Sequence, residues 1–132
     1  MIENETIPND SLSFEELCKL LLDESQIRFA GILDGMGNLV AGGFREGVEP
    51  LKNESERKKM FMEAVLRVRT RQDFDPDLGP VKYAASRRDA VVMMTFPIKG
   101  NNVLFVSAEP SIEIENFANK ILNTMRRVLG IL

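Results

Sequence analysis

The sequence contains no histidine and only one cysteine among its 132 residues. Without histidine, no side chain has an ordinary pKa near neutrality, so the usual activator of a nucleophile is missing. The single cysteine, Cys18, rules out an internal disulfide and suits a reducing compartment. It falls on the apolar side of an expected helix, so we interpret it as a packing residue. These absences predict a protein that is not an enzyme and that holds no metal or other cofactor.

Long apolar runs are missing as well. The longest, residues 90–94, is far shorter than the roughly 20 residues that a membrane-spanning helix needs. The first five residues include two acids and lack the apolar segment of a secretory signal. We therefore expect a cytoplasmic protein with no membrane partner.

The net charge of −3 conceals an uneven distribution. Residues 1–25 carry seven acids and one lysine, whereas residues 57–88 carry nine lysines and arginines and four acids. The basic segment is either an ordinary solvated surface or a face that attracts an acidic partner. Nucleic acid is a poor candidate for that partner, because the pI is about 5.1 and Tyr83 alone offers a ring near the arginines for base stacking.

A chain of 132 residues is long enough for one domain with its own core. Residues 1–11 are polar and are predicted to form a flexible tail, and residues 12–132 to form the domain. The sequence from Ser13 to Glu16 matches a capping box, a serine followed three residues later by glutamate. It predicts a first helix from Ser13 to about Asp23.

The remaining elements follow from apolar periodicity and turn residues. Strands are expected at 28–33 and 39–44, joined by a turn at 34–38 whose Gly, Asn and Asp residues tolerate positive φ. A second helix is expected over 54–72, capped by Asn53 or Ser55. Three more strands are expected at 81–86, 90–98 and 103–108, followed by a final helix with Ser111 as its N-cap. This α-β-β-α-β-β-β-α order predicts an α+β fold with a five-stranded antiparallel sheet.

The second helix carries apolar residues on more than one side. Its main stripe contains Met60, Phe61, Ala64, Val65 and Val68. Met62 and Leu66 lie one turn apart on roughly the opposite side, at about 100° per residue. This pair is either a second contact surface or two tolerated exposed side chains.

Two segments begin like ligand sites but lack essential residues. Gly35 and Gly37 open a dinucleotide fingerprint, yet Val40 replaces its third glycine and a strand follows where a helix is required. Residues 73–79 place acids at alternate positions like a calcium loop, but they lack its glycine, and Ala84 replaces its bidentate acid. We predict a hairpin turn and a polar turn, respectively.

The Arg87-Arg88-Asp89 segment lies between two expected strands. The two arginines could bind a carboxylate or a phosphate of a partner. Alternatively, the segment is a charged strand connection in which Asp89 pairs with an arginine. We keep Arg87 and Arg88 as candidate contacts for an acidic partner.

The element order resembles that of roadblock/LC7 domains and, more loosely, of profilin-like and longin domains, from Ser13 to Leu129. The turn at 34–38 is similar to the Asp-Gly turn of many roadblock-type domains, and segments 41–44 and 79–89 resemble uncharacterised archaeal proteins of unknown function. The resemblance implies a homodimer in which the middle helix and the third strand meet those of the second copy. The interface candidates it implies are Met62, Leu66, Arg69, Val81 and Tyr83.

Three classes of function follow from these observations. The first is a dimeric scaffold or regulator that contacts a small GTPase or another signalling protein, as the resemblance implies. The second is a small-molecule sensor of the PAS or GAF kind, which would need a roomy pocket between sheet and helix. Bulky Phe, Met, Ile and Leu residues at the expected core positions argue against that pocket. An enzyme is the third class, and it would have to work with carboxylates, lysines or backbone dipoles alone.

Overall fold

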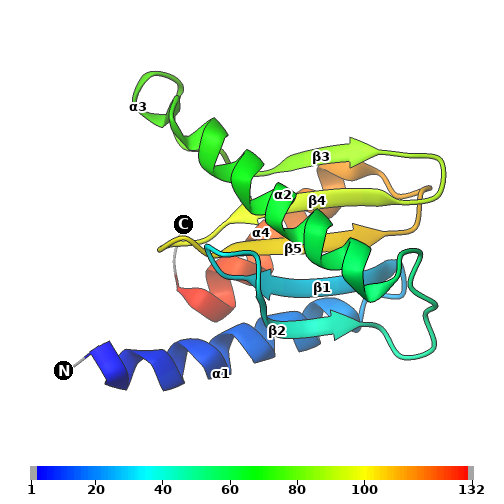
Figure 1. The fold of residues 1–132 in the computed structure, drawn as a ribbon, viewed down its shortest axis with the longest axis horizontal. Helices are drawn as coiled ribbons and strands as arrows, with labels where there is room; N and C mark the ends of the chain where they lie inside the picture. Colours follow the sequence, from blue (N-terminus) through cyan, green and yellow to red (C-terminus); the bar gives the residue numbers. More distant parts are fainter. Residues whose placement is uncertain (1–2, 131–132) are drawn as a thin grey trace.

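The computed structural model describes the backbone of residues 3–130 and the side chains of residues 12–130. It contains a five-stranded antiparallel sheet in the order β2-β1-β5-β4-β3 (Figure 1). The strands are β1 (Ile27–Leu33), β2 (Leu39–Phe44), β3 (Ala84–Arg87), β4 (Val92–Pro97) and β5 (Val103–Ala108). The expected α+β fold, strand number and element order are confirmed, with one short additional helix.

Helices cover both faces of this sheet. On one face, α1 (Glu3–Leu22) and α4 (Ile114–Leu129) pack side by side, and on the other, α2 (Glu54–Gln72) crosses the strands diagonally (Figure 1). The additional helix, α3 (Asp75–Leu78), follows α2 directly. Each of the two layers between helices and sheet contains its own apolar cluster.

The central strand β5 is buried on both faces, so every residue from Val103 to Ala108 is buried. Leu104 and Val106 point toward α1 and α4, whereas Val103 and Phe105 point toward α2. Under α2, three aromatic rings meet: the Phe61 centroid lies 5.6 Å from both Phe29 and Phe105. These rings fix α2 above β1 and β5, since packed aromatic pairs add stabilisation beyond the area they bury.

The predicted helix start at Ser13 is wrong, because α1 begins at Glu3 and continues through the capping-box residues. Serine and glutamate are tolerated inside helices, so their spacing marks a helix start only where the preceding backbone is not helical. The backbone of residues 3–11, which we expected to form part of a flexible tail, therefore belongs to α1. The side chains of the tail lie outside the described residues.

Other details differ from expectation as well, including β4, which runs from Val92 to Pro97 instead of over 90–98. Strand β3 begins at Ala84 instead of Val81, because Ala84 pairs with Thr95 and the ladder then reaches Pro97, which has no N–H to donate. The N-cap of α4 is Glu113 instead of Ser111, and its carboxylate accepts the Asn116 N–H at 2.9 Å. The predicted loop after α2 contains α3. For α2, Asn53 is the N-cap, as one of the two alternatives proposed.

Strand β2 approaches α1 and β1 closely at Gly42. This residue has φ +85°, and a Cβ atom there would collide with the Ala30 carbonyl oxygen and lie 2.8 Å from Cys18 Sγ. Gly47 has the same φ, but a Cβ atom would enter open space. A substitution at Gly47 therefore introduces backbone strain alone, whereas the same substitution at Gly42 adds a steric collision.

We predict that Gly42→Ala destabilises the domain much more than Gly47→Ala. The positive φ costs each variant about 1 kcal/mol, and overpacking adds about 2 kcal/mol or more at Gly42 alone. Urea unfolding of both variants measures the difference. Equal losses of unfolding free energy would show that the sheet moves aside to accept the new methyl group.

Candidate protein-interaction site

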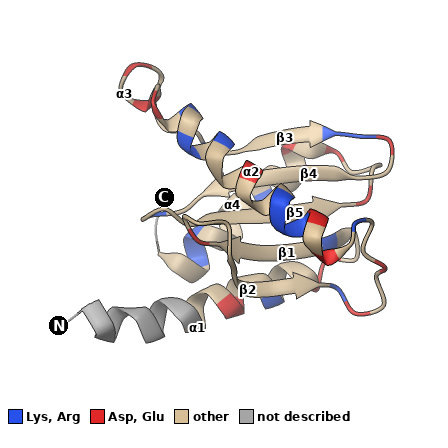
Figure 2. Cartoon of the chain, in the orientation of Figure 1, with Lys and Arg blue, Asp and Glu red and all other residues tan. Residues whose placement is uncertain are grey.

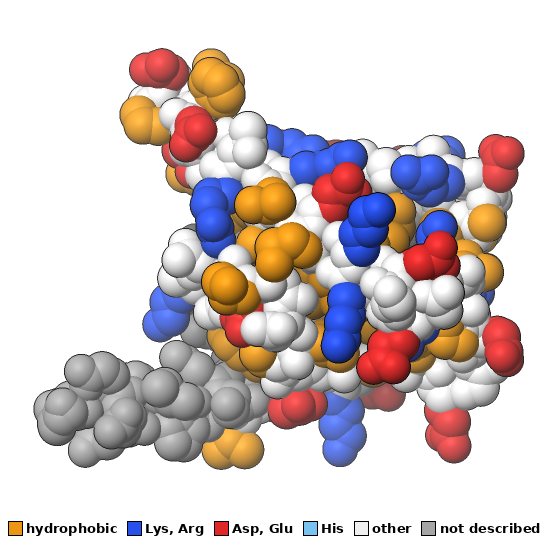
Figure 3. Space-filling view, viewed as in Figure 1, with side chains coloured by type: hydrophobic (Ala, Val, Ile, Leu, Met, Phe, Trp, Pro, Cys, Tyr) orange, Lys and Arg blue, Asp and Glu red, His pale blue; other side chains and the backbone are white. Residues whose placement is uncertain are grey.

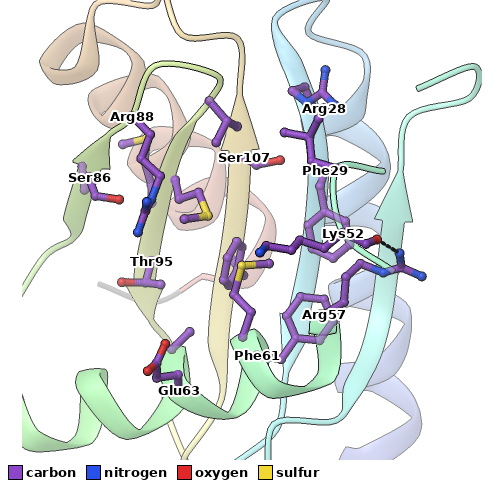
Figure 4. A pocket seen from close by; sticks show the side chains of 18 of the residues that line it. Arg28, Phe29, Lys52, Arg57, Phe61, Glu63, Ser86, Arg88, Thr95 and Ser107 are labelled. Atoms are coloured by element: carbon purple, nitrogen blue, oxygen red, sulfur yellow. Dashed lines mark hydrogen bonds between the residues drawn. The ribbon is translucent and has the colours of Figure 1, made fainter. Parts of the chain in front are cut away.

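An open groove of about 630 Å³ lies between α2 and the strands β3 and β4. It exists because α2 crosses the sheet diagonally, so that it packs on β5 and part of β4 and leaves β3 and the rest of β4 uncovered on this face. Figure 4 shows its lining, with Phe29 and Phe61 at one side and Ser86 and Thr95 at the other. Its apolar floor includes the rings of Phe29, Phe61 and Phe105 and the side chains of Met60 and Met93. Aromatic and methionine side chains are common in protein contact surfaces.

Basic side chains surround this floor. Two acids line the groove, Glu56 and Glu63, together with seven cations: Arg28, Lys52, Arg57, Lys59, Arg67, Arg71 and Arg88. The Arg57 guanidinium lies over the Phe44 ring, 5.5 Å from its centroid, and donates to the Lys52 carbonyl at 2.6 Å. The α2 helix and the β3–β4 end of the groove show this excess of blue in Figure 2. The positive field over an apolar floor favours an acidic, partly apolar ligand.

The opposite flank of α2 packs against the turn between β1 and β2. A Cβ atom at Gly37 would lie 2.9 Å from Met62 Cα, and Arg69 Nη2 donates to the Gly35 carbonyl at 2.8 Å. Met62 and Leu66 remain 36% and 49% exposed there. With the exposed Met36 of the turn they form the hairpin patch (Met36, Met62 and Leu66). Figure 3 shows hydrophobic side chains gathered over α2 and this turn.

Asp34 holds the turn in shape. Its Oδ1 atom accepts the N–H groups of Met36 at 2.9 Å and of Asn38 at 3.0 Å. Slight burial raises the pKa of Asp34, but the hydrogen bonds from Asn38 and Met36 outweigh it and lower the pKa below its usual value. A folded-state pKa that is lowered gives stabilisation at neutral pH, which is lost as the pH falls through that pKa.

The structure does not place all five predicted interface residues on one surface. Met62, Leu66 and Arg69 lie together beside the turn, at i, i+4 and i+7 on α2. Tyr83 lies against the other face of the sheet, where its ring centroid is 5.9 Å from that of Phe96 and its hydroxyl donates to Glu115 of α4. Val81 is half-buried in the segment before β3.

The two candidate arginines differ in their surroundings. Arg87 donates to the carbonyls of Pro110 and Ile112, the second at 2.8 Å, and so holds the connection between β5 and α4. Arg88 lines the groove and is exposed. Within residues 12–130, Asp89 forms an ion pair with neither arginine. Of the pair, Arg88 alone is placed to meet an acidic partner in the groove.

The other candidate groups take structural positions. Gly35 and Gly37 lie in the hairpin turn, as predicted. Cys18 is fully buried, and this burial, followed by the nearby Glu15 charge, raises the pKa of its thiol to about 12. In the part of the chain that the structure describes, no three Cys, Asp or Glu side chains are placed to hold a metal ion. None of the helices, over the same residues, is long and apolar enough to cross a membrane.

Sequence reasoning missed the groove, because it arises from the diagonal course of α2. Its floor combines Phe29 of β1 and Phe105 of β5 with Met93 of β4, residues that meet only once the strands pair. A partial signal was available in α2. Met60 and Ala64 belong to the predicted apolar stripe, yet they lie at its edge and are half-buried beside the groove.

Comparison with known proteins gives a family and a fold. A family described as "Family of unknown function (DUF6659)" matches residues 8–129. The roadblock/LC7 domain of Streptomyces avermitilis superimposes with a TM-score of 0.62 at 14% identity, covering 89% of this chain and 98% of that one. The gliding protein MglB of Thermus thermophilus gives 0.65 at 11% identity, covering 89% and 91%. Myxococcus xanthus MglB gives 0.65 at 9% identity, covering 91% and 90%. No curated protein matches the sequence.

We predict that Arg87→Ala lowers the free energy of unfolding by about 1–3 kcal/mol, because two carbonyls lose a charged donor. The matched variant Arg88→Ala should change it by less than about 0.5 kcal/mol, as expected for an exposed side chain. Denaturant unfolding of both variants gives the comparison. If Arg87→Ala were as stable as Arg88→Ala, the contacts of Arg87 with the β5–α4 connection would contribute nothing.

Proposed function

Because the chain belongs to the DUF6659 family of unknown function and has the roadblock/LC7 fold, we propose that it is a non-enzymatic, dimeric interaction domain. In this proposal it acts in the cytoplasm as a scaffold or as a regulator linked to a small GTPase. The observation that carries the proposal is the position of α2 between two partly apolar surfaces, the groove and the hairpin patch. One surface receives a second copy, and the other receives a different protein.

The groove is the surface for the second copy. Strand β3 lies at the edge of the sheet beside the groove, so one side of its backbone has no strand partner. Such an edge can pair with another strand and extend the sheet. A two-fold axis at this edge would bring the two β3 strands together and cover both apolar floors with the same contacts. This arrangement keeps the third strand in the dimer interface, as the roadblock resemblance implies, but it leaves the candidates Met62 and Leu66 outside that interface.

The hairpin patch is the surface for the second protein. A dimer built through the groove leaves it free, because Met62 lies against the turn between β1 and β2 and neither Met62 nor Leu66 lines the groove. Its backbone is held by Arg69 and Asp34, so a partner would meet an ordered surface with little entropy to lose. The exposed methionines suit an adaptable apolar contact.

The volume of the groove also favours a second candidate, a small-molecule sensor. About 630 Å³ lies within the usual range of ligand pockets, and the lining combines apolar floor with charged groups. Against it, the space between α2 and the sheet proper is filled by the rings of Phe29, Phe61 and Phe105. The groove is open at the side of β3, where a second copy would fit. A groove that stays free in solution would favour the sensor.

We predict that the wild-type protein is a dimer at micromolar concentration and that Ser86→Arg with Thr95→Arg makes it a monomer. The two long side chains would fill the groove beside β3 and leave no room for a second copy to cover its floor. Sedimentation equilibrium or light scattering gives the mass. The matched pair Met62→Glu with Leu66→Glu changes the other flank of α2 and should leave the dimer intact.

A wild type that is monomeric at high micromolar concentration would contradict the dimer. Loss of the dimer in the Met62→Glu, Leu66→Glu variant, with the groove variant still dimeric, would assign self-association to the hairpin patch instead.

We predict that the protein captures a GTPase through its hairpin patch and that this capture depends on the nucleotide bound to the GTPase. Immobilised wild-type protein should retain a GTPase from a lysate of the native host to a different extent with a GTP analogue than with GDP. The Met62→Glu, Leu66→Glu variant should lose that protein, and the dimer-breaking groove variant serves as the comparison. Retention that ignores the nucleotide would argue against a GTPase link and leave a scaffold role.

A further inference from the structure

The α3 helix forms an exposed projection at the far end of α2, beyond the edge of the sheet (Figure 1). Two large apolar side chains are exposed on it, Phe74 at 58% and Leu78 at 81%. The same six residues, 73–78, carry three acids, Asp73, Asp75 and Asp77, and no cation. We call residues 73–78 the α3 knob. Its acidic and apolar side chains stand out from the body in Figure 3.

The knob is held in place by the backbone. The N–H groups of Asp73 and Phe74 donate to Thr70 and Arg71 at the end of α2, at 3.3 and 3.2 Å. Within the knob, the Leu78 N–H donates to the Phe74 carbonyl at 2.9 Å. These bonds keep the knob at the end of α2. The groove runs alongside α2, so the exposed apolar side chains of the knob do not cover the floor of their own groove.

The knob and the groove complement each other in charge and in polarity. The groove presents seven cations and two acids around an apolar floor, whereas the knob presents the exposed acids Asp73 and Asp77 beside two exposed apolar side chains, with Asp75 half-buried. An acidic, partly apolar ligand is what the groove favours, and this chain carries one at a fixed position. Large apolar side chains exposed together on a short projection commonly mark a contact surface.

We propose that the α3 knob of one copy docks into the groove of a second copy. This inference rests on the proposed homodimer and adds the contact that specifies it. Two-fold symmetry makes the contact reciprocal, since each copy offers one knob and one groove. The closed pair then leaves no knob and no groove free, which stops assembly at two copies. The acids of the knob steer the encounter, and Phe74 and Leu78 cover part of the exposed floor.

A charge exchange tests the contact. The knob variant carries Asp73→Arg with Asp77→Arg, and the groove variant carries Lys59→Glu with Arg88→Glu, all exposed positions. Each variant alone removes the attraction and places like charges at the exchanged positions of both contacts, so its dimer dissociation constant should rise at least about tenfold. An equimolar mixture should restore the dimer as a mixed pair, because the exchanged positions then carry opposite charges at both contacts. The four changes in one chain should restore the homodimer.

The control is a charge reversal of the same size outside both surfaces, Lys99→Glu with Arg127→Glu, at two exposed positions. It should leave the dimer unchanged. Circular dichroism and thermal unfolding of each variant confirm that a lost dimer is not a lost fold. Native mass spectrometry distinguishes the mixed pair from either homodimer when one variant is isotopically labelled.

A disulfide gives a second measurement that does not depend on charge. In separate chains, Leu78→Cys places a thiol on the knob and Ser86→Cys places one in the groove. Mild oxidation of the mixture should give a covalent heterodimer that neither single variant forms in comparable yield. The natural Cys18 does not interfere, because it is buried and its pKa is raised to about 12.

The outcomes separate this inference from the proposed function. A dimeric wild type whose knob and groove variants are also unchanged dimers would overturn the knob contact and leave the homodimer standing. If each single variant loses its dimer and the mixture does not restore one, the knob contact is also overturned. The knob and the groove would then contact other parts of the second copy and not each other. A monomeric wild type would remove both proposals. Rescue in the mixture together with the knob-to-groove disulfide would establish the contact.

Discussion

The packing of Phe61 against Phe29 and Phe105 is the interaction on which the rest of this structure depends. It anchors α2 over β1 and β5, two strands that are neighbours in the sheet but distant in the sequence. With the helix fixed there, β3 and part of β4 stay uncovered on this face and the groove opens beside them. The same placement brings the other flank of α2 against the turn between β1 and β2. Both surfaces therefore follow from one aromatic cluster.

Much of the fold could be predicted from local patterns. Apolar periodicity and the turn residues at 34–38 placed β2, β5 and α2 at their observed bounds. The predicted bounds were wrong where residues outside the local pattern decide where an element begins. Strand β3 starts where β4 can still pair with it, before Pro97 ends the ladder. The start of α1 shows that a capping pattern cannot reveal whether the backbone before it is already helical.

The site was harder to predict for the same reason. The sequence indicated that Met62 and Leu66 lie outside the core, and the structure shows both exposed beside the turn. It could not indicate that Tyr83 faces α4 or that Arg87 donates hydrogen bonds to the carbonyls of Pro110 and Ile112. A strand residue changes face with every step, so a single position of register decides whether a side chain meets a partner or the core.

The contacts between α2 and the turn also carry an energetic consequence. Arg69 bonds to Gly35, and Met62 lies against Gly37, so the turn follows the helix when the helix shifts. The same helix forms one wall of the groove. Thermodynamic linkage then applies: if occupation of the groove displaces α2, the affinity of the hairpin patch changes by some factor, and occupation of the patch changes the affinity of the groove by that same factor. A domain that contains no histidine can in this way couple the state of its groove to the affinity of its hairpin patch.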